Sequence, residues 1–474
     1  MPQRDGDHDA IVIGAGAGGL TVAAGLAALG RRVALVEAGR IGGDCTNVGC
    51  IPSKRLLHLS RDPALRADPP ALLAAVRATR DGLAAREDDE VTTTEGIDVV
   101  RGRAALAPGR RVTVTGGDGV RVLTAPHVVI ATGSRPRVLA VPGLPAGRLL
   151  TNETIFDLAD APRHLAIVGA GAVGVEMAVA FARIGSRVTL VDTADRVLPD
   201  AEPEASGALA AALVEQGVVI RLRTRVVAAD PATGDLRTDG GAPLHAVDAV
   251  LAAVGREPNV GDVAAAVAVV PGGVRVDAWG RTSAPGVWAV GDVTPVAHQT
   301  HAANAHGRRI VQAIALPWIP RIGRPPSIPS AVFTEPEVAW VGPTAPERAR
   351  RCHPRALIDL RVDLAGTDRG LTDGVTRGFV AVTAVRLTGR IVAATVVGPH
   401  AADLLPLLTL AIDRRISLLR IQRMVHAYPT HAAAIGAVAD AFARRTLPHL
   451  PGEALAYGRH RFARSPAGRR HRTT

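Results

Sequence analysis

The chain contains almost no lysine. Of its 55 lysine and arginine residues, Lys54 is the single lysine and all the others are arginine. An ammonium is a compact charge on a thin stem, whereas a guanidinium is planar and broader. Because arginine is used at every other basic position, the site around Lys54 is expected to have room for the ammonium only.

Cysteine and long apolar segments are also scarce. Three cysteines are too few for a disulfide scaffold, and they fit a reducing cytoplasm better. A structural zinc site needs about four ligands, and no second cysteine pair exists, so we expect no bound metal. No apolar run reaches about 18 residues, and the first apolar segment, residues 10–13, is too short for a signal peptide. We therefore expect no membrane-spanning helix.

The formal net charge of +11 is concentrated near residue 474. Residues 459–474 carry six arginines and no acidic residue, which leaves +5 on the preceding 458 residues. We expect residues 451–474 to form a basic, disordered tail. Nucleic-acid binding through this tail is an alternative that the charge by itself does not establish.

Cys45 and Cys50 lie in a glycine-rich segment that ends at Lys54. In a regular helix, residues five positions apart have Cα atoms about 8.7 Å apart, which exceeds the limit of about 7 Å for a disulfide. Gly49 and Pro52 would supply the distortion that brings the sulfurs together, and the start of a helix lowers the pKa of a thiol. The segment predicts a redox-active disulfide; two unrelated buried cysteines are the alternative.

A strand, a glycine-rich turn and a helix occur twice, which is typical of dinucleotide-binding units. In each copy an acidic residue ends the next strand, 23 residues after the first glycine, where it can bind a ribose hydroxyl. Two such units and a redox pair predict a flavin and a nicotinamide. The residues are Gly14, Gly16, Gly19 and Glu37 in the first copy, and Gly169, Gly171, Gly174 and Asp192 in the second.

Asp192 also bears on the choice of nicotinamide. A carboxylate at this position accepts a hydrogen bond from the 2′-hydroxyl of NADH and repels the 2′-phosphate of NADPH. We therefore expect NADH to be preferred. Arg196 lies close in the sequence and would favour NADPH if it reached the ribose.

Together these motifs resemble those of the flavoprotein disulfide reductases, the class I pyridine nucleotide-disulfide oxidoreductases, over roughly residues 8–445. The resemblance implies an α/β fold with two Rossmann-like domains, for FAD and NAD(P), and a C-terminal α+β dimerisation domain. It also implies a homodimer whose active sites are shared between subunits. The implied domains are 1–150 and 271–329 for FAD, 151–270 for NAD(P) and 330–450 for the interface, with the tail at 451–474.

The resemblance assigns roles to individual residues. Cys50 would face the flavin, Cys45 would exchange with the acceptor, and Glu176 would pair with Lys54 beside the flavin. The turn at Ala297 and His298 would start a helix whose amides stabilise negative charge on the reduced flavin. The other implied cofactor contacts are Gly43, Lys54, Ala104, Thr132, Gly133, Ser134 and Asp292 for FAD, and Gly255 for NAD(P).

One departure from the family lies in the interface domain. Thiol reductases of the family carry His-x-His-Pro-Thr-x-x-Glu, whereas this chain has Tyr428 in place of the second His and Ala433 in place of the Glu. Mercuric reductase and its relatives similarly carry a tyrosine there. A phenol with a pKa of about 10 cannot act as an imidazolium at neutral pH. His426 and His431 flank Tyr428 and are alternative proton donors.

The expected function is electron transfer from NAD(P)H through FAD and the Cys45–Cys50 disulfide to an unidentified small-molecule, thiol, disulfide or metal-ion acceptor, as in the mercuric-reductase-like branch. The alternatives are a dihydrolipoamide dehydrogenase-like enzyme, a diaphorase or quinone reductase with incidental cysteines, and a redox-sensing subunit with slow turnover. Mercuric reductase itself delivers metal through a C-terminal cysteine pair. Here the last cysteine is Cys352, which we expect to be an idle thiol.

Overall fold

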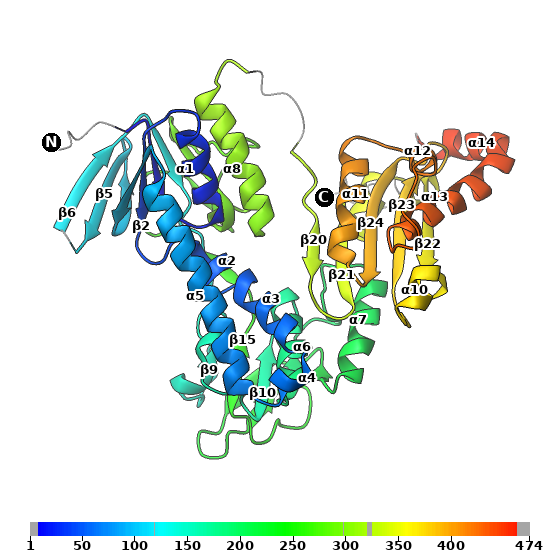
Figure 1. Ribbon diagram of the computed structural model, residues 1–474, viewed down its shortest axis with the longest axis horizontal. Helices are drawn as coiled ribbons and strands as arrows, with labels where there is room; N and C mark the ends of the chain where they lie inside the picture. Colours follow the sequence, from blue (N-terminus) through cyan, green and yellow to red (C-terminus); the bar gives the residue numbers. More distant parts are fainter. Residues whose placement is uncertain (1–7, 118, 297, 320–324, 462–474) are drawn as a thin grey trace, which may run out of the picture.

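The computed structural model describes residues 8–117, 119–296, 298–319 and 325–461, which form three units (Figure 1). Two units are built on five-stranded parallel sheets, and the third is built on a five-stranded antiparallel sheet. Helix α5 (Pro69–Thr93) extends from the first unit to the second. The α/β fold class, with two Rossmann-like units and a separate third domain, is confirmed.

The first sheet has the strand order β19-β7-β1-β2-β3. Strand β1 is a run of four buried apolar residues, as expected for a parallel strand that is covered on both faces. Helices α1 and α8 cover one face, and a three-stranded meander covers the other. The elements are β1 (Ala10–Ile13), α1 (Ala17–Ala27), β2 (Val33–Glu37), β3 (Ile97–Arg101), β4 (Arg103–Ala107), β5 (Arg111–Gly116), β6 (Gly119–Thr124), β7 (His127–Ile130), β19 (Val287–Ala289) and α8 (Thr300–Ala315).

The second sheet has the order β12-β11-β10-β15-β9. Strand β9 (Leu149–Leu150) belongs to it, so this unit begins just before the expected boundary at residue 151. The chain passes between the two units through the antiparallel pair β8 (Ser134–Pro136) and β16 (Arg256–Pro258). The other elements are β10 (His164–Val168), α6 (Ala172–Arg183), β11 (Arg187–Val191), α7 (Pro203–Glu215), β12 (Val219–Arg221), β13 (Val226–Ala229), β14 (Leu236–Thr238) and β15 (Ala249–Ala252).

The two glycine-rich turns have the same steric logic. Gly14 has a φ of +105° and Gly169 a φ of +114°, which is the left-handed region that favours glycine. A Cβ on Gly19 would lie 1.9 Å from the Gly14 carbonyl oxygen, and one on Gly174 would lie 1.8 Å from the Gly169 carbonyl oxygen. Only glycine therefore allows each helix to pack this closely on its turn.

The third unit has the strand order β20-β21-β24-β23-β22. Its core joins the sheet to helices α11 and α13, which agrees with the α+β domain expected there. The elements are β20 (Ser330–Val332), β21 (Glu337–Val341), α9 (Ala345–Arg351), β22 (Leu357–Asp363), α10 (Asp368–Thr372), β23 (Phe379–Val385), β24 (Ile391–Gly398), α11 (Ala401–Asp413), α12 (Leu418–Ile421) and α13 (Ala433–Thr446).

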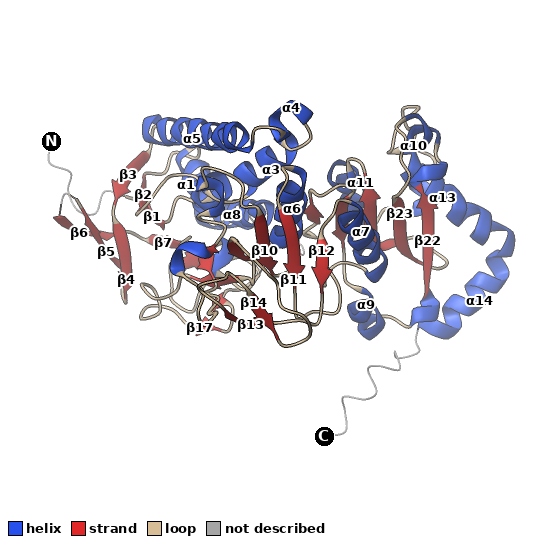
Figure 2. Cartoon of the chain, turned by 90° about the horizontal axis from the view of Figure 1, so that it is seen from below, coloured by secondary structure: helices blue, strands red, loops and turns tan. Residues whose placement is uncertain are grey.

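The expectation of a disordered tail from residue 451 is wrong for residues 451–461. These residues belong to helix α14 (Leu450–Arg461), at the opposite end of the molecule from the meander (Figure 2). Its anchor is Glu453, whose two carboxylate oxygens each accept a hydrogen bond of 2.9 Å from Arg386. Both bonds come from Nη1 of Arg386, and a hydrogen bond between two charged groups is among the stronger hydrogen bonds in proteins. The rest of the expected tail lies outside the described residues.

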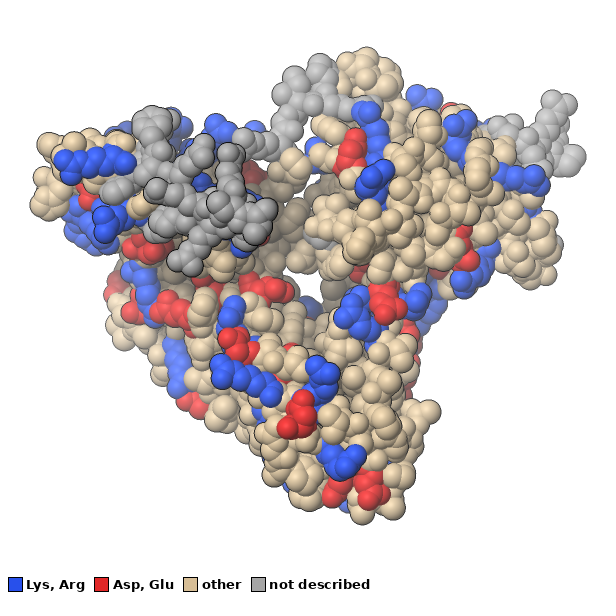
Figure 3. Space-filling view, turned by 180° about the vertical axis from the view of Figure 1, so that it is seen from behind, with Lys and Arg blue, Asp and Glu red and all other residues tan. Residues whose placement is uncertain are grey.

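Surface charge and helix hydropathy of the described residues bear on possible binding to nucleic acid or to a membrane. Basic and acidic side chains are interspersed on the face shown in Figure 3, so the net positive charge is not gathered in one patch there. Among the described residues, none of the helices combines the length and apolar character needed to cross a bilayer.

Candidate functional site

A cavity of about 690 Å³ lies where the first and second units meet. It brings together most of the residues predicted for the flavin and the thiols. Those that line it are Gly14, Gly16, Glu37, Gly43, Cys45, Cys50, Lys54, Ala104, Thr132, Gly133, Ser134, Glu176, Asp292 and His298. Gly19 packs behind the turn, and the second glycine motif, Asp192, Gly255 and Tyr428 are not among the lining residues.

The cysteines lie on two successive helices, α2 (Gly43–Asn47) and α3 (Cys50–Leu59). The break falls at Val48 and Gly49, and a Cβ on Gly49 would lie 2.8 Å from the Asp44 carbonyl oxygen. Gly49 therefore provides the predicted distortion, whereas Pro52 lies in the first turn of α3, where proline is tolerated. Both cysteines are free thiols in the structure.

The two thiols differ strongly in acidity. A hydrogen bond from the Cys45 thiol lowers the pKa of Cys50 to about 6, and the charge of Lys54 contributes in the same direction. Cys50 is also the first residue of α3, where the helix dipole favours a thiolate. The interaction with Cys50 raises the pKa of Cys45. At neutral pH the pair therefore carries one negative charge, on the Cys50 sulfur, while Cys45 keeps its proton.

Thr300 also contacts the thiolate, and no sequence motif pointed to this residue. Its Oγ1 lies 3.7 Å from the Cys50 Sγ, and its hydroxyl contributes to the lowered pKa of Cys50. Thr300 is the first residue of α8, so this helix begins after the predicted position at Ala297 and His298. His298 instead lies beside the Thr294 carbonyl, at 3.3 Å from its Nε2, and Ala297 lies outside the described residues.

Lys54 joins all three units. Its Nζ donates a hydrogen bond of 2.8 Å to Oε2 of Glu176 on α6, and it lies 4.9 Å from the ring centre of Phe333. The other carboxylate oxygen of Glu176 accepts a hydrogen bond of 3.0 Å from the Phe333 backbone N–H. Glu176 is only 4% exposed, so the charge of Lys54 and this amide are its compensating partners. Phe333 was not identified from the sequence.

Glu37, the last residue of β2, and Asp192, which follows β11, bind their glycine turns in the same way. Glu37 accepts hydrogen bonds from the amides of Ala15, at 2.6 Å, and Gly39, at 2.7 Å. Asp192 accepts them from the amides of Ala170, at 2.5 Å, and Ala194, at 2.7 Å. These contacts hold each acid at its glycine turn.

The backbone of each turn is open to a ligand. A Cβ on Gly16 would meet nothing nearer than the Gly43 Cα at 3.9 Å, and one on Gly171 would meet nothing within 4 Å. Open glycines at a helix start leave the amides free for a pyrophosphate. The residues present therefore fit a dinucleotide at each turn. The guanidinium of Arg196 binds the backbone close by in the sequence, because its Nη2 donates to the Pro199 carbonyl at 2.6 Å.

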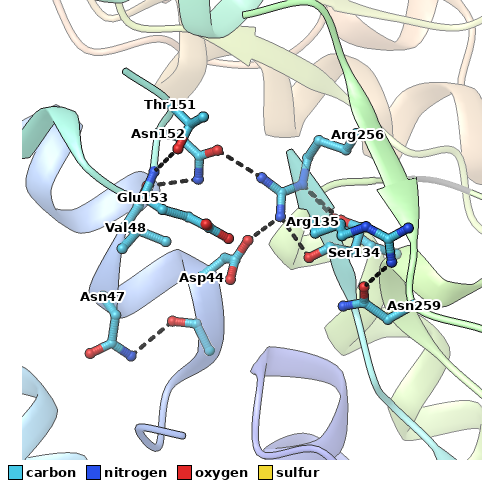
Figure 4. Close-up of polar contacts among 12 residues, drawn as sticks. Asp44, Asn47, Val48, Ser134, Arg135, Thr151, Asn152, Glu153, Arg256 and Asn259 are labelled. Atoms are coloured by element: carbon cyan, nitrogen blue, oxygen red, sulfur yellow. Dashed lines mark hydrogen bonds and ion pairs between the residues drawn. The ribbon is translucent and has the colours of Figure 1, made fainter. Parts of the chain in front are cut away.

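Ser134 belongs to a polar network centred on Arg256 (Figure 4), and Asp292 joins this network through Ser134. The Ser134 hydroxyl donates to Oδ2 of Asp292 at 2.9 Å and accepts from Nε of Arg256 at 2.7 Å. Arg256 also forms an ion pair with Asp44, next to Cys45. Arg256 follows Gly255, which has a φ of +99°. The sequence motifs identified Gly255 but not Arg256.

Tyr428 lies on the third unit and is 76% exposed. Its hydroxyl donates to Oδ2 of Asp368 at 3.0 Å, which raises the pKa of the phenol. His431 is buried, with its Nε2 3.0 Å from Oδ2 of Asp373. Cys352 ends helix α9 as a free thiol. Among the described residues, no cluster of His, Cys, Asp and Glu is arranged to hold a metal ion.

Comparisons with protein families and known proteins agree with this architecture. Residues 8–307 match the model of the pyridine nucleotide-disulphide oxidoreductases, and residues 328–439 match their dimerisation domain. A mercuric reductase from Streptomyces lividans is 34% identical, with 93% of this chain and 98% of the relative covered. A dihydrolipoyl dehydrogenase from Chlamydia pneumoniae is 30% identical, with coverage of 90% and 94%.

Solved structures give the same result. The Cu(II) complex of RclA from Escherichia coli, an HOCl-induced flavoprotein disulfide reductase, superposes with a TM-score of 0.83 at 26% identity, over 92% of this chain and 99% of that one. LpdA from Mycobacterium tuberculosis superposes with a TM-score of 0.82 at 26% identity, over 91% and 99%. The chain thus belongs to the pyridine nucleotide-disulphide oxidoreductases, enzymes that use FAD and NAD(P)H.

Proposed function

We propose that the chain takes two electrons from NAD(P)H, passes them through FAD to the Cys45–Cys50 disulfide, and delivers them to an external acceptor. The observation that carries this proposal is that the acidic Cys50 thiol, the Cys45 thiol and the Lys54–Glu176 pair line the same cavity. Each cycle balances, because the two electrons and the proton of one hydride convert the disulfide to one thiol and one thiolate, which then reduce the acceptor by two electrons.

The cofactors have separate binding regions in this proposal. FAD would lie on the turn at Gly14, Gly16 and Gly19, with Glu37 at its ribose, and extend along the cavity to the thiols. The cavity residues Gly43, Lys54, Ala104, Thr132, Gly133, Ser134, Asp292 and His298 would line its path. NAD(P)H would lie on the second turn, at Gly169, Gly171, Gly174, Asp192 and Gly255. FAD supplies the conversion between hydride transfer and thiol chemistry.

The chain's own groups have distinct tasks. Lys54 would hold positive charge beside the flavin, and Glu176 would fix its position. Cys50 would remain a thiolate when the pair is reduced, and Cys45, which keeps its proton, would exchange with the acceptor. A reducing compartment such as the cytoplasm suits a pair that must return to thiols.

For the acceptor we favour a mercuric-reductase-like reaction over dihydrolipoamide oxidation. Tyr428 supports this choice, because a phenol hydrogen-bonded to Asp368 does not supply the imidazole of the thiol-specific enzymes. We propose that the chain is a homodimer in which Tyr428 of each subunit faces Cys45 of the other. The exposure of Tyr428 in the single chain is compatible with a position at such an interface.

An anaerobic titration of the FAD-loaded protein with NADH tests the disulfide route. We expect a long-wavelength band after two electrons per subunit, because the Cys50 thiolate would contact the flavin. Since the pKa of Cys50 is lowered to about 6, the band should persist from about pH 8 towards pH 6 and disappear below it as the thiolate is protonated. Cys50→Ser should lack the band. A wild-type protein without it would contradict this route and favour a diaphorase.

Replacement of the single lysine tests the compact site. We expect Lys54→Arg to fold but to slow flavin reduction by NADH about tenfold or more, because a guanidinium cannot replace the ammonium between Glu176 and the Phe333 ring. Stopped-flow absorbance measures the rate. Arg61→Lys, the reverse exchange at an exposed ion pair, is the control and should leave the rate unchanged. A wild-type rate and spectrum in Lys54→Arg would show that the site accommodates either cation.

Asp192 tests the choice of nicotinamide. We expect a higher kcat/KM for NADH than for NADPH, and Asp192→Ala should narrow the difference about tenfold, because a repulsive carboxylate is removed. Arg196→Met should leave the ratio unchanged, since Arg196 is engaged by the Pro199 carbonyl. Steady-state kinetics with both nucleotides measures the ratio. A wild-type preference for NADPH, or a ratio governed by Arg196, would contradict the assignment.

Tyr428→Phe separates acceptor chemistry from the preceding steps. The acceptor is first identified by turnover of Hg(II), dithiols and quinones. Loss of the hydroxyl should then slow turnover of that acceptor by ~10²-fold, the usual scale for an acid–base group, while flavin reduction by NADH is retained. Tyr457→Phe, the same change at the other tyrosine, is the control. Unchanged turnover in Tyr428→Phe would return Tyr428 to a packing role.

A further inference from the structure

We infer that Arg256 is a positioning residue that holds helix α2, and with it Cys45, in register with Cys50. This inference rests on the proposed dithiol–disulfide cycle and deepens it, because it names the group that sets how readily the disulfide forms. Arg256 contacts neither sulfur. It acts through Asp44, at the start of α2, and through Asn152, which binds the Val48 carbonyl at the end of α2.

All the nitrogen atoms of the Arg256 guanidinium are engaged (Figure 4). Nε donates to Oγ of Ser134 at 2.7 Å, and Nη1 donates to Oδ1 of Asn152 at 3.1 Å. Nη2 donates to the Ser134 carbonyl at 2.9 Å and to Oδ2 of Asp44. The planar fork of a guanidinium can serve several partners at once, which an ammonium cannot do with the same geometry.

Asn152 links Arg256 to the other end of α2. Its Nδ2 donates to the Val48 carbonyl at 3.2 Å, while its Oδ1 accepts from Arg256. Val48 is the residue that ends α2, in the break between the two cysteines. Arg256 therefore fixes the Asp44 side chain directly and orients the amide that fixes Val48. Cys45 lies between these two points.

Helix α2 needs such support because it is too short to be stable alone. It has five residues, and the residue before it, Gly42, has a φ of +94°. Short helices are marginal without tertiary contacts, since the first turn costs more conformational entropy than its single hydrogen bond returns. Asn47 contributes internal contacts, donating from Nδ2 to the carbonyls of Ile41 and Gly43, at 2.9 Å each. The contacts of Arg256 and Asn152 connect the helix to the second unit and to the β8–β16 pair.

Arg256 lies in a connection that also packs on the second glycine-rich turn. Strand β15 of the second unit ends at Ala252, and Arg256 opens β16 shortly after it. The carbonyl of Ala253, in the same connection, lies against the Gly169 turn, where a Gly169 Cβ would approach it to 2.2 Å. The segment that packs on the Gly169 turn thus also holds helix α2.

The expected consequence concerns the dithiol–disulfide equilibrium. When α2 is held, Cys45 remains close to Cys50, so the disulfide closes readily; when α2 is released, closure carries a larger entropy cost. We expect Arg256→Met to reduce the equilibrium constant for disulfide formation about tenfold, which raises the reduction potential by ~30 mV for this two-electron couple. Asp44→Asn, which removes only the charge of the partner, should shift it in the same direction by a smaller factor.

The test is a redox titration of the Cys45–Cys50 couple in the FAD-loaded protein. Reduced dithiothreitol gives the pair two electrons and one proton, and its second proton passes to the buffer because Cys50 remains a thiolate. Quenched alkylation with mass spectrometry counts the reduced cysteines at each position. Circular dichroism melts verify that each variant is folded. Arg137→Met is the matched control, since Arg137 is an exposed arginine beside β8 that pairs only weakly, at 3.9 Å, with Glu257.

The double variant Asp44→Asn/Arg256→Met distinguishes a specific pair from general damage. If Arg256 acts through Asp44, the double variant should shift the potential no more than Arg256→Met does, because coupled residues are non-additive. Shifts that simply add, or a shift in Arg256→Met no larger than in Arg137→Met, would overturn the inference. If the wild-type protein showed no dithiol–disulfide couple at all, the proposed function would fail and the inference with it.

Discussion

The ion pair between Lys54 and Glu176 is the contact on which the arrangement of the three units depends. Lys54 belongs to α3 of the first unit, Glu176 to α6 of the second, and Phe333 of the third donates its amide to the second oxygen of Glu176. A buried carboxylate is costly unless its oxygens are paired and hydrogen-bonded. The three units must therefore be docked correctly before Glu176 is compensated, which connects assembly of the fold to assembly of the site.

Cys45 and Cys50 line the same cavity but differ in the pKa of their thiols. Cys50 starts a helix, receives a hydrogen bond from Cys45 and lies near Lys54, whereas Cys45 is on a one-turn helix and keeps its proton. The difference arises from position, because a helix start and a nearby cation favour a thiolate. A pair with one acidic and one protonated sulfur is suited to separate partners inside and outside the cavity.

The two dinucleotide-binding units stabilise their glycine turns by the same contacts. Glu37 and Asp192 each bind two amides around a glycine turn, and the third glycine of each motif packs on the first. The units differ in what surrounds the turn. The first opens on the cavity that contains the thiols, while the second is connected to that cavity through the segment that contains Gly255 and Arg256.

The sequence by itself determined the features that depend on neighbours along the chain. The glycine turns, the acids that follow them, the break at Gly49 and the buried parallel strands are all set by backbone sterics and by short-range hydropathy patterns. The family's motifs extended this to Glu176 as the partner of Lys54. The helical order of residues 451–461 was missed, because Arg386, which anchors Glu453, lies 67 residues earlier.

Only the tertiary structure decided which distant groups meet at the site. Thr300 reaches Cys50 across 250 residues, Phe333 reaches Glu176 across 157, and Arg256 reaches Asp44 across 212. None of these residues has a local pattern that marks it, since a threonine at a helix start or an arginine after a strand is common. Thr300 meets Cys50 through the folding of the first unit, whereas Phe333 and Arg256 meet their partners where separate units dock. Both kinds of contact are governed by packing and charge compensation between surfaces rather than by spacing along the chain.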